Sequence, residues 1–218
     1  MKNFWTYIKN EKFAIGCTGQ TVYVYDKNEN ELAKFKDLKY AYRAMFCPNK
    51  NIFAVKSTEP YIAFYSLDKM QLLKKIKLKN THSPQDDGFC FSPDGKQFLN
   101  LEFLDDLTSN LVIYDTEKFE EIARIFIGEN AVLNHIEYDE KNRAYYVLGY
   151  LRSKQDNEYC IFEIKNNKVI GKKRILEEQA QNLQNSKQYQ LSGYTEKQKK
   201  WLDGDFTDAT FAQIYKYS

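Results

Sequence analysis

The chain has 218 residues, of which 43% are hydrophobic and 28% charged, and this balance is typical of a globular protein rather than a disordered one. Because 32 basic side chains are matched by 30 acidic ones, the net charge of +2 gives no reason to expect a nucleic-acid partner. No stretch approaches the roughly 18 apolar residues of a membrane-spanning helix. Residues 1–7 also lack the apolar run of a signal peptide, so we expect a cytoplasmic protein without a membrane partner.

Aromatic residues distinguish this composition, with 17 Tyr and 15 Phe against only 2 Trp. Tyr and Phe favour half-buried strand positions, so the composition points toward β structure. Glycine is scarce at 9 residues, and Asn, Asp and Lys occupy most of the positions where turns are expected.

The first repeated pattern is an apolar run, a polar turn and a second apolar run. Residues 89–99 show it most clearly, because Pro93, Asp94 and Gly95 stand together in the turn. Proline presets φ, aspartate bonds its own backbone and glycine accepts a positive φ, so this segment predicts a β-hairpin. Further copies are anchored on aromatic residues, namely Tyr7, Phe46, Tyr138 and, least regular of them, Tyr194.

A second pattern follows each hairpin, and it is an alternating strand that ends in an aromatic and usually an acidic residue. Its copies are residues 22–26, 62–68, 111–115, 159–163 and 211–217, of which the last lacks the acid. After four of these copies come a polar turn and a further short strand, at residues 31–36, 71–78, 120–127 and 168–176. Because the patterns recur in step, the chain reads as repeats of four strands each.

Four strands in a repeat of about 40–45 residues is the period of a β-propeller blade. Here the chain resembles the WD-repeat propeller superfamily. The resemblance is carried by the hairpin of residues 91–96 and by the pairs Tyr25-Asp26 and Tyr114-Asp115, which stand where that family has Trp-Asp. It implies the fold and says almost nothing about function.

We therefore predict an all-β chain, a small β-propeller of about five four-stranded antiparallel blades in a single domain of residues 1–218. The blades are expected at residues 1–36, 37–78, 84–127, 130–176 and 188–218. The last blade lacks an outer strand, so it is either degenerate or replaced by a helical cap. Residues 177–188 are polar and free of Gly and Pro, so they form either a long surface connection or one or two helical turns, and residues 195–202 can form a short helix. Another all-β fold, such as a sandwich, is the remaining alternative.

Candidate functional residues lie in the longest predicted loops, at residues 79–87, 104–110 and 151–157. In propellers, these connections gather on one face, which is where sites on this architecture are commonly found. Seven residues near that face are expected to bind a partner: Asp86, Asp87, Asp105, Asp106, Arg152, Asp156 and Asp205. Basic residues concentrate in the opposite turns, and such a dipolar arrangement steers a basic partner toward the acidic face.

The sequence offers little support for catalysis, metals or cofactors. Cys17, Cys47, Cys90 and Cys160 form no C-x-x-C pair and are expected to be buried reduced thiols. His82 and His135 are too few for a convincing zinc site, and no phosphate-binding glycine-rich loop or G-x-S-x-G motif is present. We therefore expect no catalytic residue, no metal and no cofactor.

The function that follows is a non-enzymatic module that binds a protein partner through loops on one face. A small-ligand or glycan-binding propeller is the alternative, and a glycoside-hydrolase-like enzyme is third. Ligand pockets repeated in every blade require the same residues in every blade. The predicted loops differ in length and composition, which favours one asymmetric interface.

Overall fold

The computed structural model describes residues 2, 4–79, 88–104, 106–192, 202 and 205–217. In this part of the chain 16 strands form four sheets, each with four antiparallel strands in chain order. The chain divides into two compact units, Met1–Gln85 with Gln188–Trp201 and Asp86–Lys187 with Leu202–Ser218, called here unit 1 and unit 2. Each unit holds two of the sheets.

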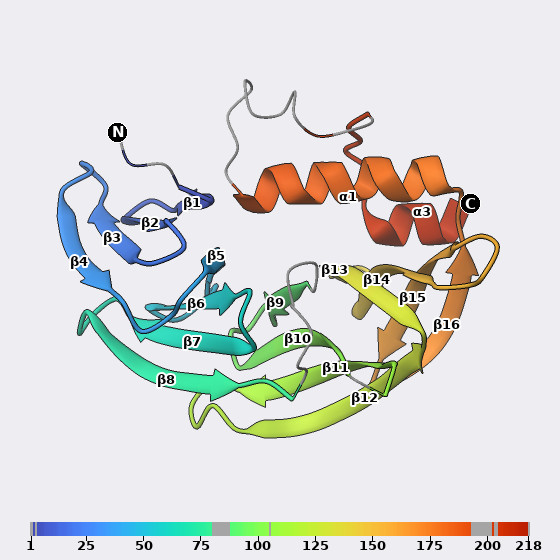
Figure 1. Cartoon of the computed structure of the whole chain (residues 1–218), viewed down its shortest axis with the longest axis horizontal. Coiled ribbons are helices and arrows are strands. Elements are labelled where there is room, and N and C mark those ends of the chain that lie inside the picture. The colour runs from blue at the N-terminus through green and yellow to red at the C-terminus, as the bar shows by residue number, and fades with distance from the viewer. Residues whose placement is uncertain are drawn as a thin grey trace. The chain divides into compact units, whose positions relative to one another are not determined.

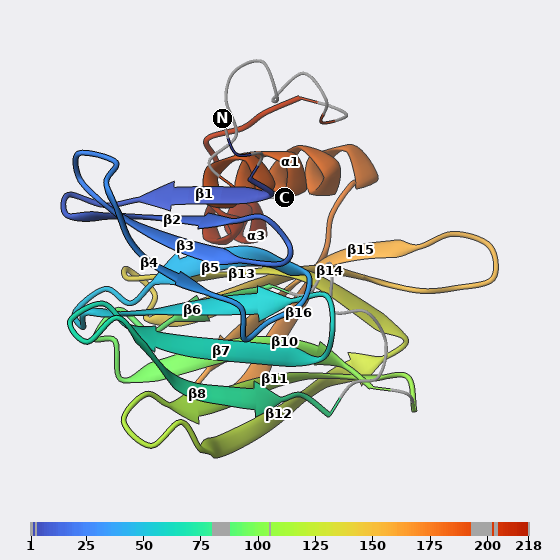
Figure 2. The same cartoon turned by 60° about the vertical axis from the view of Figure 1, so that its left-hand side comes forward.

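Unit 1 contains the first two sheets, and their strands lie side by side in sequence order (Figure 2). The first consists of β1 (Thr6–Lys9), β2 (Phe13–Cys17), β3 (Val22–Asp26) and β4 (Glu31–Phe35). The second consists of β5 (Ala41–Phe46), β6 (Ile52–Ser57), β7 (Tyr61–Ser66) and β8 (Gln71–Lys77). Alternate side chains of both sheets, among them Ile15, Val24, Phe53, Val55 and Tyr65, form one buried core.

Unit 2 contains the other two sheets. One consists of β9 (Phe89–Phe91), β10 (Gln97–Phe103), β11 (Thr108–Asp115) and β12 (Glu121–Glu129). The other consists of β13 (Ala131–Asp139), β14 (Ala144–Leu151), β15 (Glu158–Lys165) and β16 (Lys168–Arg174). The two sheets share a buried core. In it, Leu99 and Ile113 of the β9–β12 sheet contact the cluster that holds Val147 and Phe162 of the β13–β16 sheet, and Leu111 lies in the same core.

The predicted hairpin turn at residues 92–96 is confirmed in detail. The Ser92 hydroxyl donates to the Asp94 carboxylate at 2.6 Å, and the amide of Lys96 donates to it at 3.0 Å. Gly95 takes a φ of 67°. Elsewhere residues other than glycine adopt positive φ, and they include asparagines such as Asn166 and Asn167 as well as bulky residues such as Met70 and Phe119. This substitution explains how a chain with so few glycines makes so many turns.

Two helices cover the β13–β16 sheet in unit 2 (Figure 1). Helix α1 (Glu177–Ser192) supplies Ala180 and Leu183, and helix α3 (Phe211–Tyr217) supplies Phe211. They pack on the face of the sheet that carries Tyr146 and Ile161. The helical cap is therefore correct, and the prediction of a strand at residues 211–217 is wrong. The predicted fifth hairpin at Tyr194 lies outside the described residues.

The error at residues 211–217 has a physical reason in the residue that precedes them. The amide of Gln213 bonds the Thr210 hydroxyl at 3.2 Å, and the amide of Thr210 bonds the Gln213 side-chain oxygen at 2.8 Å. This Thr-x-x-Gln capping box satisfies two amides that a helix start leaves unpaired. Phe211, Ala212, Ile214 and Tyr215 then share one helical face, which packs on the sheet.

Helix α1 is also longer than the one or two turns that were expected. It begins with Glu177 and Glu178, whose negative charges stabilise the helix by interacting with the positive end of its dipole. The Gln179 side chain accepts a hydrogen bond from the amide of Leu176 at 3.2 Å. No helix within the described part of the chain is long and apolar enough to cross a membrane.

The Thr210→Ala variant tests the capping box. We expect it to lower the free energy of unfolding by about 1 kcal/mol, because one amide of α3 loses its partner. Gln213→Ala should lower the free energy of unfolding by a similar amount. The double variant should lose less than the sum of the two single losses, as measured by urea unfolding. Strictly additive losses would contradict a reciprocal cap.

Candidate partner-binding surface

Four of the seven predicted binding residues lie in the described part of the chain, and all four belong to unit 2. Asp106, Arg152, Asp156 and Asp205 are exposed. The remaining three, Asp86, Asp87 and Asp105, lie outside the described residues.

The connection between β10 and β11 is shorter than predicted. Strand β11 already begins at Thr108, so the connection ends before it, and the amides of Leu104 and Leu107 donate to the carbonyls of Thr108 and Leu104 at 2.8 and 3.0 Å. The Asp106 carboxylate closes it by accepting from the Thr108 hydroxyl at 2.6 Å and from the Thr108 amide at 3.0 Å. These bonds lower the pKa of Asp106 from its ordinary value, because they favour the charged form.

Leu107, at the corner of this turn, was missed by sequence reasoning. It has a φ of 65°, a conformation that costs a leucine energy and that asparagine or glycine adopts more readily. Its side chain is 45% exposed. Leu107 therefore places an apolar side chain in solvent beside Asp106.

Backbone hydrogen bonds join this turn to two other connections of unit 2. The Leu107 carbonyl accepts from the amide of Asn130, between β12 and β13, at 2.7 Å. The Asn130 carbonyl in turn accepts from the amide of Arg152, in the β14–β15 connection, at 2.8 Å. We call Leu104, Asp106, Leu107, Asn130 and residues 152–157 the loop surface.

Arg152 is held from a second side as well. Its guanidinium lies 5.5 Å from the centroid of the Phe103 ring, within the range of a cation–π interaction. Further along the same loop, the Ser153 hydroxyl donates to the Asp156 carbonyl at 2.6 Å and accepts from the Asp156 amide at 3.1 Å. The loop of residues 152–157 is therefore folded on itself before any partner arrives.

The structure thus brings together three of the predicted residues, Asp106, Arg152 and Asp156, on connected loops. Asp205 lies elsewhere in unit 2, where its amide donates to the Asn182 side chain on α1 at 2.9 Å. The described loop surface has mixed charge, because Arg152 and Lys154 accompany the two acids.

The described residues hold no group of three or more His, Cys, Asp or Glu side chains that could bind a metal ion. The cysteines are free thiols; Cys17, Cys47 and Cys160 are buried as expected, whereas Cys90, also expected to be buried, is only half-buried. Burial raises the pKa of Cys17 to about 12, and it raises that of Cys90 to about 12 although Lys187 lowers it. Both thiols therefore stay protonated at neutral pH, which makes them poor nucleophiles.

Comparison with known proteins shows the fold. No protein-family model matches the chain, and no curated protein matches its sequence. The chain is similar in structure to Kuenenia stuttgartiensis hydrazine synthase, with a TM-score of 0.67 and 14% identity over 81% of this chain and 50% of that one. It is also similar to the dihydro-heme d1 dehydrogenase NirN in complex with DHE, with a TM-score of 0.59 and 13% identity over 78% of this chain and 37% of that one.

Both are β-propeller proteins, and the four-stranded sheets of this chain are propeller blades. The fold is a small β-propeller with helices α1 and α3 after its fourth blade. The chain spans half of the hydrazine synthase chain and 37% of the NirN chain.

The same comparison corrects one expectation. From the sequence we expected a chain that is not an enzyme. The similar structures contradict that expectation. Both similar structures carry the names of enzymes, one a synthase and the other a dehydrogenase. The propeller fold seen here therefore has enzymatic members, and the absence of familiar catalytic motifs is no argument against activity.

A pH titration tests the Asp106 cap. We expect the Thr108 amide resonance to titrate with a midpoint below the ordinary aspartate value of 3.8, because the folded loop stabilises the carboxylate. The cap stabilises the loop above the unfolded pKa, and that contribution disappears as the pH falls through the lowered folded value. Asp106→Asn should abolish the titration, and a midpoint at or above 3.8 would contradict the cap.

Thiol alkylation tests the chemical state of the cysteines. Because burial raises the pKa of Cys17 and Cys90 to about 12, iodoacetamide should label these thiols far more slowly in the folded protein than in the unfolded one. Complete labelling is expected in denaturant. Rapid labelling of Cys90 in the folded chain would show an accessible thiolate instead.

Proposed function

We propose that this chain binds a protein partner through the loop surface of unit 2. The observation that supports this most is the pair of backbone hydrogen bonds from Leu107 through Asn130 to Arg152. They hold three loops in one arrangement before binding, so less conformational entropy is lost when a partner docks.

Two side chains on this surface are suited to anchor a partner. Leu107 offers exposed apolar area, and Arg152 offers a charged group whose position the Phe103 ring already restricts. Arginine is enriched among residues that dominate binding energies, and apolar anchors fill pockets on the partner. Asp106, Lys154 and Asp156 surround them as a polar rim, which favours selectivity and association rate over raw affinity.

A glycan or small-ligand pocket repeated in each blade is less well supported. It requires matching residues at the same place in each sheet, and the connections between the second and third strands differ. They are residues 18–21, 58–60, 104–107 and 152–157. We also propose that the chain belongs to the WD-repeat superfamily. The strands that end in Tyr25-Asp26 and Tyr114-Asp115 support this.

Substitutions at the two anchors test this function. Full-length Arg152→Glu and Leu107→Asn chains are immobilised and compared with the wild type for proteins recovered from the native cell, quantified by mass spectrometry. Asparagine tolerates the positive φ at position 107, so the second variant removes the apolar side chain without adding strain. We expect each variant to recover a specific partner at least about tenfold less well, equivalent to about 1.4 kcal/mol or more.

The matched control is Arg143→Glu. Arg143 is an exposed arginine in the β13–β14 turn, at the other end of β14 from the loop surface. The Arg143→Glu variant makes the same charge reversal as Arg152→Glu in the same sheet, and it should leave recovery of the partner unchanged. If both anchor variants recover the partners of the wild type in full, the loop surface is not the binding site.

A further inference from the structure

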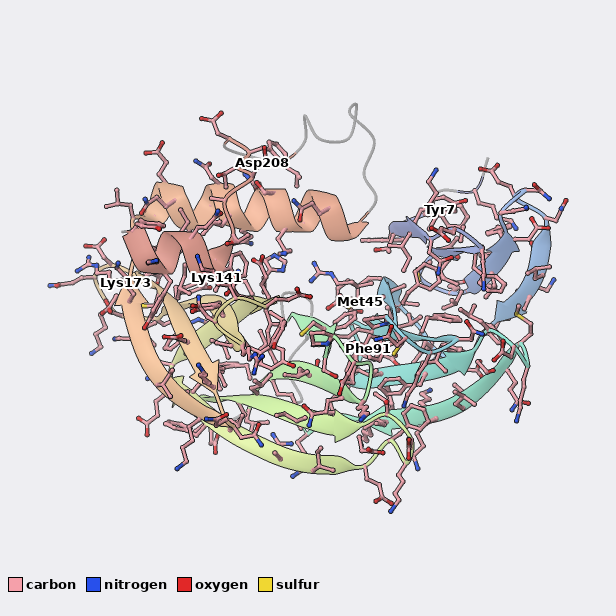
Figure 3. The ribbon with its side chains drawn as sticks, turned by 180° about the vertical axis from the view of Figure 1, so that it is seen from behind. Tyr7, Met45, Phe91, Lys141, Lys173 and Asp208 are labelled. Carbon is pink, nitrogen blue, oxygen red and sulfur yellow. The ribbon has the colours of Figure 1, made fainter. Side chains whose placement is uncertain are left out.

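The first sheet of unit 1 carries aromatic side chains on the face that points away from its core. Val24 on β3 lies in that core, and because strand side chains alternate, its neighbours Tyr23 and Tyr25 point to the opposite face. Their rings are stacked, with centroids 6.1 Å apart. Tyr7 on β1 (Figure 3) shares this face, because it is paired with Gly16 on β2, which is paired with Tyr23.

The ring of Phe4 completes this group. Its centroid lies 5.3 Å from that of Tyr7, and 6.2 and 6.3 Å from those of Tyr23 and Tyr25. Such separations are those of favourable aromatic pairs. Phe4 fits here because Gly16 lies beneath it, where a Cβ atom would collide with its ring. The sequence of β2 therefore leaves room for a fourth ring.

An ammonium group already lies on these rings. Lys2 places its Nζ atom 3.7 Å from the centroid of the Tyr23 ring and 5.5 Å from that of Tyr25, within the range of cation–π interactions. The same atom donates to the Glu31 carboxylate at 2.7 Å and to the Tyr25 hydroxyl at 3.1 Å. The hydrogen bond to Glu31 and, after it, the one to Tyr25 raise the pKa of Lys2, because they favour its charged form. We call Phe4, Tyr7, Tyr23, Tyr25 and Glu31 the aromatic cage.

Anchoring of Lys2 does not by itself account for the aromatic cage. The side chains of Lys2 and Glu31 are 43% and 38% exposed. Ion pairs between groups as exposed as these contribute little to stability, since water solvates both charges when they separate. Lys2 can therefore leave the cage at little cost, which opens the Tyr23 ring and the Glu31 carboxylate to another cation. Aromatic faces arranged around an ammonium group are a common means of recognising cationic ligands.

We propose that the aromatic cage binds a lysine side chain of a partner protein, which takes the place of Lys2. The side chain of Lys2 shows that a lysine fits, since it makes all of the required contacts at once. The face of Tyr23 receives the cation, while the Glu31 carboxylate and the Tyr25 hydroxyl accept hydrogen bonds from its N–H groups. A trimethylated lysine has no N–H group to donate, so the cage prefers the unmodified side chain. The cage lies in unit 1 and the loop surface in unit 2, so this binding does not depend on the proposed function.

Titrations of the full-length chain with Nα-acetyl-lysine amide test this site, followed by the NMR resonances of the tyrosine rings. We expect Lys2→Ala to bind this probe at least about threefold more tightly than the wild type, because the tethered competitor is gone. The trimethylated probe should bind Lys2→Ala more weakly than the unmodified one. The probe with an acetylated side chain carries no charge and should not bind at all.

Substitutions in the cage are compared in the Lys2→Ala chain. Tyr23→Leu should lower the affinity for the unmodified probe at least about threefold, because the ring beneath the cation is lost. The matched control is Tyr138→Leu, which removes a half-buried tyrosine of a ring pair in unit 2 and should leave the affinity unchanged. Tyr25→Phe keeps the ring and loses the hydroxyl acceptor, so it should weaken binding of the unmodified probe but not that of the trimethylated one.

Unfolding measurements guard against a trivial loss of structure. Lys2→Ala should keep the urea midpoint of the wild type, since the ion pair of Lys2 is exposed. If Tyr23→Leu does not fold, Glu31→Gln replaces it and should bind the unmodified probe more weakly, since it keeps the shape of the side chain and loses its charge. The proposal is overturned if the unmodified probe does not bind folded Lys2→Ala, if the uncharged probe binds equally well, or if the folded cage variant binds as tightly as Lys2→Ala.

Discussion

Burial of the β13–β16 sheet on both of its faces is the constraint on which unit 2 depends. Val147 and Phe162 point into the core shared with the β9–β12 sheet, while Leu148 and Ile161 point the other way, beneath α1 and α3. A sheet with two apolar faces needs a cover on each side. The helices α1 and α3 supply the second cover, so they stand where a fifth blade would stand.

The same constraint positions the loops. A strand buried on both faces cannot slip by one residue without exchanging its two sets of side chains, so the ends of β10, β11, β14 and β15 are pinned. The connections at those ends are then short or folded on themselves, and Leu107, Asn130 and Arg152 meet through backbone groups. A rigid scaffold with ordered loops is well suited to recognition, whichever partner or chemistry the loops serve.

Local pattern was enough to predict the hairpins, the four-strand repeats and the fold class, because alternation and turn residues act over a few positions. The same reasoning failed at residues 211–217, whose apolar residues suit a strand as well as a helix, and where the cap at Thr210 decides. The hydrogen bond between Leu107 and Asn130 joins backbone groups, so no side-chain pattern in the sequence predicts it. The aromatic cage combines side chains of β1, β3 and β4 with Phe4, and the alternation within a single strand does not reveal that they meet.

The central claim is that α1 covers the β13–β16 sheet as a missing blade would. Its most direct test is the free energy of unfolding of Leu183→Ala, measured with urea against the wild type. Leu183 is buried in the core between α1 and the sheet, so the variant should lose about 2–4 kcal/mol through lost apolar burial and the cavity left behind. A loss below about 0.5 kcal/mol, as expected for an exposed position, would show that α1 does not cover the sheet.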